Sequence, residues 1–301
     1  MSVKVDHQLL DPSYLKQIED YSLLAKVVVD GAMPGVHRSL KQGRGNEFYQ
    51  YRPYTHGEDL KYVDWKVFAK REELVSKTFQ EDTNFTICLV LDSSASMEYK
   101  GGRASCSKFN YLKMLAACFA YLGFRQGDRL GLFAYSDQVK TWIRPKSGSG
   151  QLNRVFSALQ DLKAEGEDAH DFAWDKMVSV LPGRAMVVFL SDFLEAEDSL
   201  AEKLRFSMSS RYESLCLQIL DPDEIDLPVE ESLRFAEMEG DRELSTSPPA
   251  IRDEYLKDMD DFINNLRHKL SAVSCEFESL CTDQDLGHAL RRFIGMRNKN
   301  L

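Results

Sequence analysis

The sequence has no apolar run near the roughly 18 residues that a membrane-spanning helix requires. Its first stretch, MSVKVDHQLLDPSYL, contains acids and no hydrophobic block. We therefore expect neither membrane insertion nor a secretory signal peptide. Basic residues are outnumbered, because 38 Lys and Arg face 48 Asp and Glu, for a net charge of −10. Nucleic-acid binders are usually basic, since phosphate neutralisation dominates their affinity, so nucleic acid is not an expected partner.

Motifs for several common chemistries are also missing. The six cysteines form no CxxC pair and the six histidines form no HxxxH or HExxH pattern, which argues against a zinc site. There is no Walker motif and no GxSxG elbow, and GRGNEF supplies only the first two glycines of GxGxxG. Several cysteines lie in apolar stretches such as ICLVL and AACFAYL, so we expect reduced core residues of a cytoplasmic protein.

From residue 84 onward the sequence alternates regularly between strand and helix patterns. Runs such as FTICLVLD predict strands buried on both faces, and KFNYLKMLAACFAYLGF has apolar residues at helical spacing. Strands are expected at 85–92, 128–136, 139–145, 184–192, 213–221 and 274–283. Helices are expected at 108–124, 148–162, 172–181, 199–208, 250–271 and 286–296, with a hairpin around Gly240 and Asp241. This alternation predicts an α/β domain with a mostly parallel sheet and helices on both faces.

The first part of the chain has a different character. Residues 13–30 favour a helix, whereas residues 35–79 are rich in glycine, arginine and aromatic residues and show no clean period. We therefore expect an N-terminal extension over residues 1–83, packed on a main domain that covers residues 84–301.

The stretch LVLDSSASM places three oxygen-bearing side chains just past a buried strand. Residues i, i+2 and i+4 of an extended loop project the same way, so Asp92, Ser94 and Ser96 can direct their oxygens at one point. One carboxylate and two hydroxyls suit a hard cation such as Mg²⁺ or Mn²⁺, but a second acid is needed. Asp192, at the end of VVFLSD, is the natural candidate, because a neighbouring parallel strand would place it near the same loop.

A simpler interpretation of the same residues is an ordinary turn. Asp and Ser favour turns because their side chains bond to nearby backbone, and the DxSxS pattern alone indicates no more than that. The position of the pattern after a buried strand, together with the strand-end acid Asp192, favours the metal site.

LDSSASM resembles the first motif of the metal-ion-dependent adhesion site of von Willebrand factor A-type domains, and VVFLSD resembles the third. The resemblance implies a Rossmann-like von Willebrand factor A fold with a Mg²⁺ site. In that family the second motif is a threonine in a loop that precedes a helix. The matching loop here is PKSGSGQLNRV, which has no threonine, and Ser147 or Ser149 is the candidate replacement.

The preceding segment is similar to the signature of a bacterial family called domain of unknown function 58. The glycine-rich start of that signature matches GRGNEF, and its later elements match Arg52, Asp59, Asp64 and Trp65. These residues could form a polar network that braces the metal loop. We favour the alternative, a structural role in which Trp65 anchors a core and the charges are paired at the surface.

The family resemblance implies a non-catalytic, Mg²⁺-dependent protein-binding module. Members of the family resemble von Willebrand A-type proteins found with MoxR-type AAA+ ATPases, so the implied partner is such an ATPase or its client, and the implied role is that of an adaptor or chaperone partner. Two alternatives stay open: a metal-assisted phosphohydrolase that uses the same strand-end pocket, and a scaffold with a vestigial metal site. A Lys or Arg that converges with Asp192 on the metal, in a deep closed pocket, would favour the enzyme.

Overall fold

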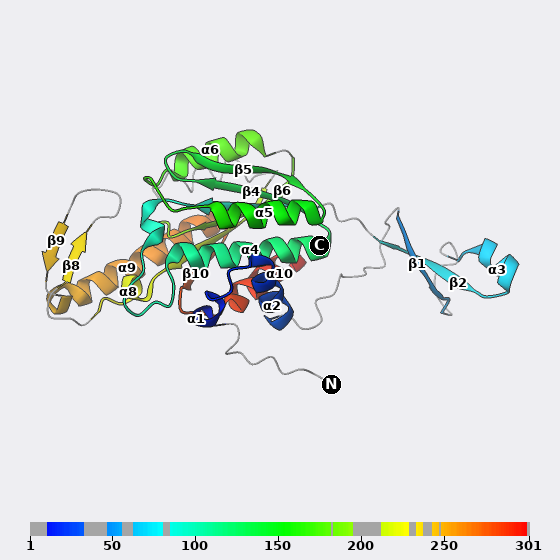
Figure 1. Ribbon diagram of the computed structural model, residues 1–301, viewed down its shortest axis with the longest axis horizontal. Coiled ribbons are helices and arrows are strands. Elements are labelled where there is room, and N and C mark those ends of the chain that lie inside the picture. Colours follow the sequence, from blue (N-terminus) through cyan, green and yellow to red (C-terminus); the bar gives the residue numbers. More distant parts are fainter. Residues whose placement is uncertain are drawn as a thin grey trace. The chain divides into compact units, whose positions relative to one another are not determined.

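The computed structural model in Figure 1 describes residues 11–32, 47–55, 63–80, 85–181, 183–194, 212–228, 233–236, 243–246 and 248–299. The chain divides into two compact units. Unit 1 combines Met1–Gly35 with Phe85–Leu301, and unit 2 is Val36–Asn84. In the ranges above, no helix combines the length and the apolar character needed to cross a membrane.

Unit 1 is built on a six-stranded sheet with the order β10-β7-β6-β3-β4-β5. The strands are β3 (Thr86–Asp92), β4 (Arg129–Tyr135), β5 (Val139–Lys146), β6 (Ala185–Ser191), β7 (Tyr212–Leu220) and β10 (Glu276–Cys281). All neighbours pair in parallel except β5, which runs antiparallel to β4. Counted from β3, this is the doubly wound order 3-2-1-4-5-6. Every residue of β3 and of β6 is buried, as their continuous apolar runs predict.

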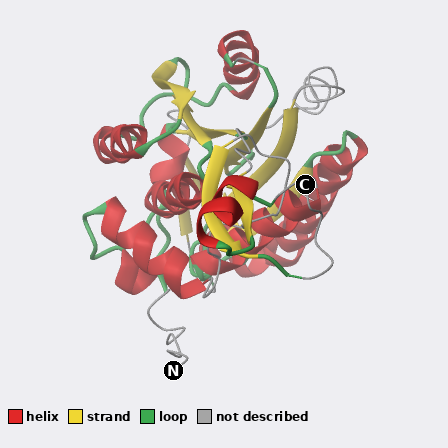
Figure 2. Ribbon diagram, turned by 90° about the vertical axis from the view of Figure 1, so that its right-hand side faces the viewer, coloured by secondary structure: helices red, strands yellow, loops and turns green. Residues whose placement is uncertain are grey.

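Helices cover both faces of this sheet, as Figure 2 shows with the strands in yellow and the helices in red. Helices α6 (His170–Val180) and α9 (Pro248–Ala272) pack on one face, around a core that includes Val90, Phe189 and Trp174. Helices α4 (Lys108–Gln126) and α5 (Ser149–Asp161) lie against the other face. The predicted α/β architecture is therefore confirmed.

Helix α4 is buried almost all round, as its sequence predicts, because a second layer of helices covers its outer side. That layer consists of α2 (Tyr21–Ala32) and α10 (Leu286–Lys299). The rings of Phe119 in α4 and Phe293 in α10 lie 4.8 Å apart. The side chain of Ser107 caps the start of α4 by accepting a hydrogen bond from the backbone N–H of Asn110, and Gly127 ends the helix at a φ of 84°. These caps fix Lys108 as the first residue of α4.

The prediction of one helix over residues 13–30 is wrong, because two helices occupy this stretch. Helix α1 (Pro12–Leu15) is capped by Asp11, and α2 begins only at Tyr21. The Asp20 side chain starts α2 by accepting a hydrogen bond from Ser22 N at 2.7 Å.

Other predicted elements near the C-terminal half are seen in part. Strands β8 (Leu233–Ala236) and β9 (Glu243–Thr246) form the expected hairpin, whose turn lies outside the described residues. The helix expected at 199–208 also lies outside them. A short helix, α8 (Pro222–Ile225), follows β7.

Unit 2 is a hairpin with a short helix. Strand β1 (Glu47–Pro53) pairs antiparallel with β2 (Val75–Gln80), and α3 (Trp65–Arg71) lies between them in the sequence. Asp64 caps α3 by accepting hydrogen bonds from Lys66 N at 2.9 Å and Val67 N at 3.3 Å. The segment expected to be extended and without a period thus contains regular structure.

The division of the chain differs from the expected one on the N-terminal side. Unit 1 resumes at Phe85, and it also includes the residues before position 36. The reason is the apolar stripe on α2: Leu24, Ala25, Val28 and Val29 are all buried where this helix meets α4.

Candidate metal centre

Asp92 and Asp192 lie at the point where the strand order of the sheet reverses. Asp92 is the last residue of β3, and Asp192 directly follows β6, the parallel neighbour of β3. In open α/β sheets, ligands bind outside the carboxyl ends of the strands at this switch point. Both side chains are buried, with 0% and 2% of their surface exposed. The predicted pair is therefore brought to one place.

The loop after β3 arranges its hydroxyls around these carboxylates. Asp92 Oδ1 accepts hydrogen bonds from Ser94 N at 2.9 Å and from Ser94 Oγ at 2.7 Å. Ser94 Oγ lies 3.1 Å from Ser96 Oγ, which in turn donates to Asp192 Oδ2 at 3.3 Å. Ser94 is the N-cap of the 3₁₀ helix η3 (Ala95–Glu98), and this tight turn brings Ser96 back toward the strand ends.

The consecutive spacing of this row of four oxygens is compatible with a small hard cation. An octahedral Mg²⁺ with ligands at 2.0–2.1 Å separates neighbouring ligand oxygens by about 3.0 Å. The consecutive separations from Asp92 Oδ1 through Ser94 and Ser96 to Asp192 Oδ2 are 2.7, 3.1 and 3.3 Å. The donor set of carboxylates and hydroxyls is also the one that Mg²⁺ and Mn²⁺ prefer.

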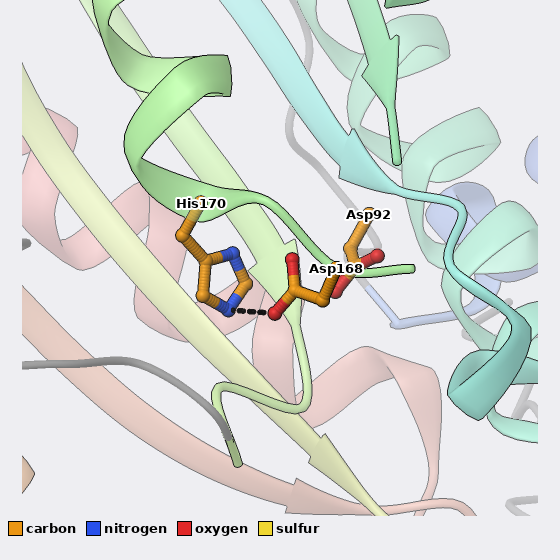
Figure 3. A group of neighbouring side chains, drawn as sticks. All are labelled: Asp92, Asp168 and His170. Atoms are coloured by element: carbon orange, nitrogen blue, oxygen red, sulfur yellow. Dashed lines mark ion pairs between the residues drawn. The ribbon is translucent and has the colours of Figure 1, made fainter. Parts of the chain in front are cut away.

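The sequence did not reveal two further site residues, Asp168 and His170. Figure 3 shows both beside Asp92, and one ligand atom of each of the three side chains lies within 4.8 Å of the others. His170 Nε2 and Asp168 Oδ2 form an ion pair at 2.8 Å, while Tyr135 OH lies 2.6 Å from His170 Nδ1. Asp168 lies in the loop between α5 and α6, and His170 is the first residue of α6. The same loop hydrogen bonds to the β3 loop through Glu165 N and Ser93 O at 2.8 Å.

Burial and the neighbouring acids raise the pKa of Asp92 to about 7. Loss of hydration is the largest cause, and the charges of Asp168 and Asp192 add to it. His170 and a 2.7 Å hydrogen bond from Ser191 Oγ to Asp92 Oδ2 oppose the increase. The described part of the site thus holds more negative charge than its own cations balance, which a divalent ion would correct.

Ser147 and Ser149 do not join the site, which corrects their assignment as replacements for the missing threonine. Both are exposed and lie where β5 passes into α5. Because β5 is antiparallel, its last residue, Lys146, pairs with Leu130 near the start of β4. The two serines therefore lie at the amino edge of the parallel strands, opposite the edge that carries Asp92. The loop that does reach the site is the one carrying Asp168.

The third strand-end acid, Asp221, has a structural role next to the site. It caps α8 in a capping box with Glu224, whose Oε2 accepts a hydrogen bond from Asp221 N at 2.8 Å. Glu224 Oε1 and Asp192 Oδ2 both accept hydrogen bonds from Lys108 Nζ, at 2.6 and 2.7 Å. Lys108 thereby links α8 to the row of oxygens.

The residues of unit 2 that match the family signature differ in burial and in the contacts they make. The Asp64 carboxylate is 5% exposed, caps α3 and accepts a hydrogen bond from Tyr51 OH at 2.9 Å. Trp65 is 55% exposed and contacts Phe68 edge to face, so its assignment as a core anchor is wrong. Arg52 lies in β1 opposite Ser76, and Asp59 lies outside the described residues. The network that would brace the metal loop, which the sequence analysis did not favour, stays an open alternative.

The 3-2-1-4-5-6 sheet with one antiparallel strand, and an Asp-x-Ser-x-Ser loop at its switch point, define a Rossmann-like domain of the von Willebrand factor A type. Within that class, the chain belongs to the family described as Protein of unknown function DUF58, whose model matches residues 50–262. The resemblance seen in the sequence is thereby confirmed.

Comparisons with individual proteins return similar sequences and folds. A Mycobacterium tuberculosis protein described as uncharacterized is 27% identical over 294 residues, which cover 96% of this chain and 91% of that protein. Among solved structures, an aerotolerance-related membrane protein from Bacteroides fragilis has 16% identity and a TM-score of 0.48, covering 71% of this chain and 99% of that one. The BatB protein from Bacteroides thetaiotaomicron has 14% identity, the same coverage and the same TM-score.

Proposed function

We propose that the chain is a non-catalytic, Mg²⁺- or Mn²⁺-dependent protein-binding module that acts in the cytoplasm as an adaptor or chaperone partner of a MoxR-type AAA+ ATPase. The row of four oxygens, set in a surplus of buried negative charge, carries the metal part of this proposal. Asp92, Ser94, Ser96 and Asp192 would hold the ion. The ATPase partner rests on the family resemblance alone.

A bound ion would supply a docking point with a defined chemistry. Mg²⁺ prefers six oxygen ligands, so an ion held by these four groups keeps positions for water or for a carboxylate from the partner. Such a contact is charged, directional and absent without the metal, which gives specificity as well as affinity.

Capture of a purified MoxR-type ATPase on the immobilised protein tests the proposal. We expect capture in Mg²⁺ that is lost with a chelator and lost in Asp92→Asn. Ser149→Ala is the matched control, because this exposed serine lies at the opposite edge of the sheet and should leave capture unchanged. Circular dichroism of each variant reports whether it is folded. Equal capture with and without chelator, by wild type and Asp92→Asn, would refute metal-dependent docking.

One observation favours the alternative of a metal-assisted phosphohydrolase, namely that Lys108 converges with Asp192 on the site. The ammonium is 1% exposed and already bonded to two carboxylates, so we prefer the non-catalytic assignment. Turnover of p-nitrophenyl phosphate that needs Mg²⁺ or Mn²⁺ and is lost in Asp92→Asn would establish the enzyme instead. A metal titration with no heat and no stabilisation up to millimolar concentrations would instead indicate a vestigial site.

A further inference from the structure

Lys108 is a buried cation inside the candidate metal centre. Its side chain is 1% exposed, and its Nζ lies 2.7 Å from Asp192 Oδ2 and 2.6 Å from Glu224 Oε1. Lysine is almost never buried to this degree unless it is paired. The caps of α4 hold the residue at the first turn of the helix, facing the carboxyl ends of the strands. The site therefore already contains one fixed positive charge of its own.

The ammonium and a metal ion would share the same oxygen. Asp192 Oδ2 is the atom bonded to Lys108, and it is also the last of the four oxygens that fit a cation. An ion coordinated by this oxygen at about 2.1 Å would lie at most about 4.8 Å from Nζ, the sum of that distance and 2.7 Å. Positive charges this close, in a buried place with little screening, repel one another strongly.

We propose that Lys108 is a tethered cation that competes with the metal ion for Asp192 and so sets the metal affinity of the site. This inference rests on the proposed metal-dependent function and names how that site is regulated. Glu224 provides the carboxylate that holds the Lys108 ammonium when a metal ion occupies Asp192. Its Oε2 is held by Asp221 N, so Oε1 stays in place to keep the ammonium when a metal ion takes Asp192.

The position of Lys108 explains how this cluster of acids can be stable when no metal ion is bound. With the ammonium bridging the buried Asp192 and the partly buried Glu224, both carboxylates are paired without any ion. Metal binding then exchanges one ion pair for another instead of filling an unpaired site, and this exchange weakens the net affinity. After this pairing, the negative charge that a metal ion would still balance lies around Asp92.

Removal of the lysine charge tests the competition directly. Lys108→Met should tighten binding of Mg²⁺ and Mn²⁺ by about tenfold or more, measured by calorimetry, because the nearest repelling charge is gone. Its thermal midpoint without metal should fall, and added metal should raise that midpoint more than in wild type. Lys113→Met is the matched control. Lys113 lies on the same helix with its Nζ over the Phe109 ring, so its loss should leave metal affinity unchanged.

A measurement on the wild-type protein covers the case in which Lys108→Met does not fold. The buried ammonium should give a resolved side-chain ¹⁵Nζ signal, assigned by its loss in Lys108→Arg. Addition of Mg²⁺ should shift that signal and leave the signal of Lys113 in place. A Lys108 signal that stays fixed while Mg²⁺ binds would overturn the competition.

The outcomes separate this inference from the proposed function. If wild type and Lys108→Met bind Mg²⁺ equally well, the competition is wrong and metal-dependent docking stands. If only Lys108→Met binds the ion, the competition is supported and the native chain docks without metal. If neither protein binds Mg²⁺ or Mn²⁺, both proposals fail.

Discussion

The pKa of the buried Asp92 leads to a prediction about stability without metal. In the folded chain this pKa is about 7, against 3.8 for an ordinary aspartate, because burial and the nearby acids disfavour the charged form. Between these two pH values the folded chain holds a proton that the unfolded chain has released. The free energy of unfolding therefore falls as pH rises from about 4 to about 7, and this contribution stays flat above that range.

The size of the effect follows from the gap between the two pKa values. The gap between about 7 and 3.8 is roughly 3 pH units, and 1.36 kcal/mol per unit gives a cost of about 4 kcal/mol at pH 8. Part of this cost comes from Asp168 and Asp192, because their charges help to raise the pKa of Asp92. Asp92→Asn removes the titrating group, and its amide can still meet the hydroxyls of Ser94 and Ser191. The variant should therefore be more stable than wild type at pH 8 without metal, by up to about 4 kcal/mol.

Urea unfolding between pH 4 and 8, in chelator, measures this difference. In a Trp65→Phe background the fluorescence comes from Trp142 and Trp174, which both pack in unit 1. Excess Mg²⁺ at pH 8 should stabilise wild type and leave Asp92→Asn unchanged. Equal pH dependence of the two proteins between pH 4 and 7 would refute the reasoning.

His170 makes a second contribution to the change of the free energy of unfolding with pH. Burial alone would lower its pKa, but the hydrogen bond and charge of Asp168 and the charge of Asp92 raise it. A histidine with a raised pKa stabilises the fold below its unfolded pKa of about 6.5, and that stability is lost as pH rises through the folded pKa. The part of the slope that comes from His170 should therefore appear above about pH 6.5.

Three further predictions concern single positions. Gly101→Ala should destabilise unit 1 by about 1–3 kcal/mol in urea unfolding, because its Cβ would lie 2.3 Å from a carboxylate oxygen, whereas Gly150→Ala meets nothing within 4 Å and should be neutral or stabilising. Asp64→Ala should cost unit 2 about 1 kcal/mol through loss of the α3 cap, and unchanged amide exchange in α3 would contradict this. Asp168→Ala should weaken Mn²⁺ binding in calorimetry and Ser149→Ala should not, and the reverse result would restore the serine loop as part of the site.

The order and type of most elements in unit 1 could be predicted from the sequence because their signals are local. Strands β3 and β6 are continuous apolar runs, and α4 repeats its apolar residues at helical spacing. The break between α1 and α2 was missed because it depends on one capping side chain, Asp20, inside a helical pattern. The hairpin of unit 2 was missed because residues 35–79 have no clean alternation.

The site could be predicted only where its residues follow strands. Asp92 and Asp192 end neighbouring parallel strands, so the fold class alone brings them together. The assignment of Ser149 failed because the direction of β5 decides which edge the next loop reaches. Asp168 lies in a loop with no period and His170 opens the helix after it. Their signal was topological: after an antiparallel strand, the following helix must return the chain to the carboxyl edge.

Unit 1 is discontinuous in the sequence, and this has a consequence for the order in which the protein folds. Helix α2 is made before unit 2, and its partner α4 is made after it. During synthesis, at roughly 5–20 residues per second, the apolar stripe of α2 must wait several seconds for a surface to cover it. Unit 2 leaves the ribosome within that interval, while the stripe on α2 is still uncovered. A chaperone that guards this protein during synthesis would therefore meet α2 first.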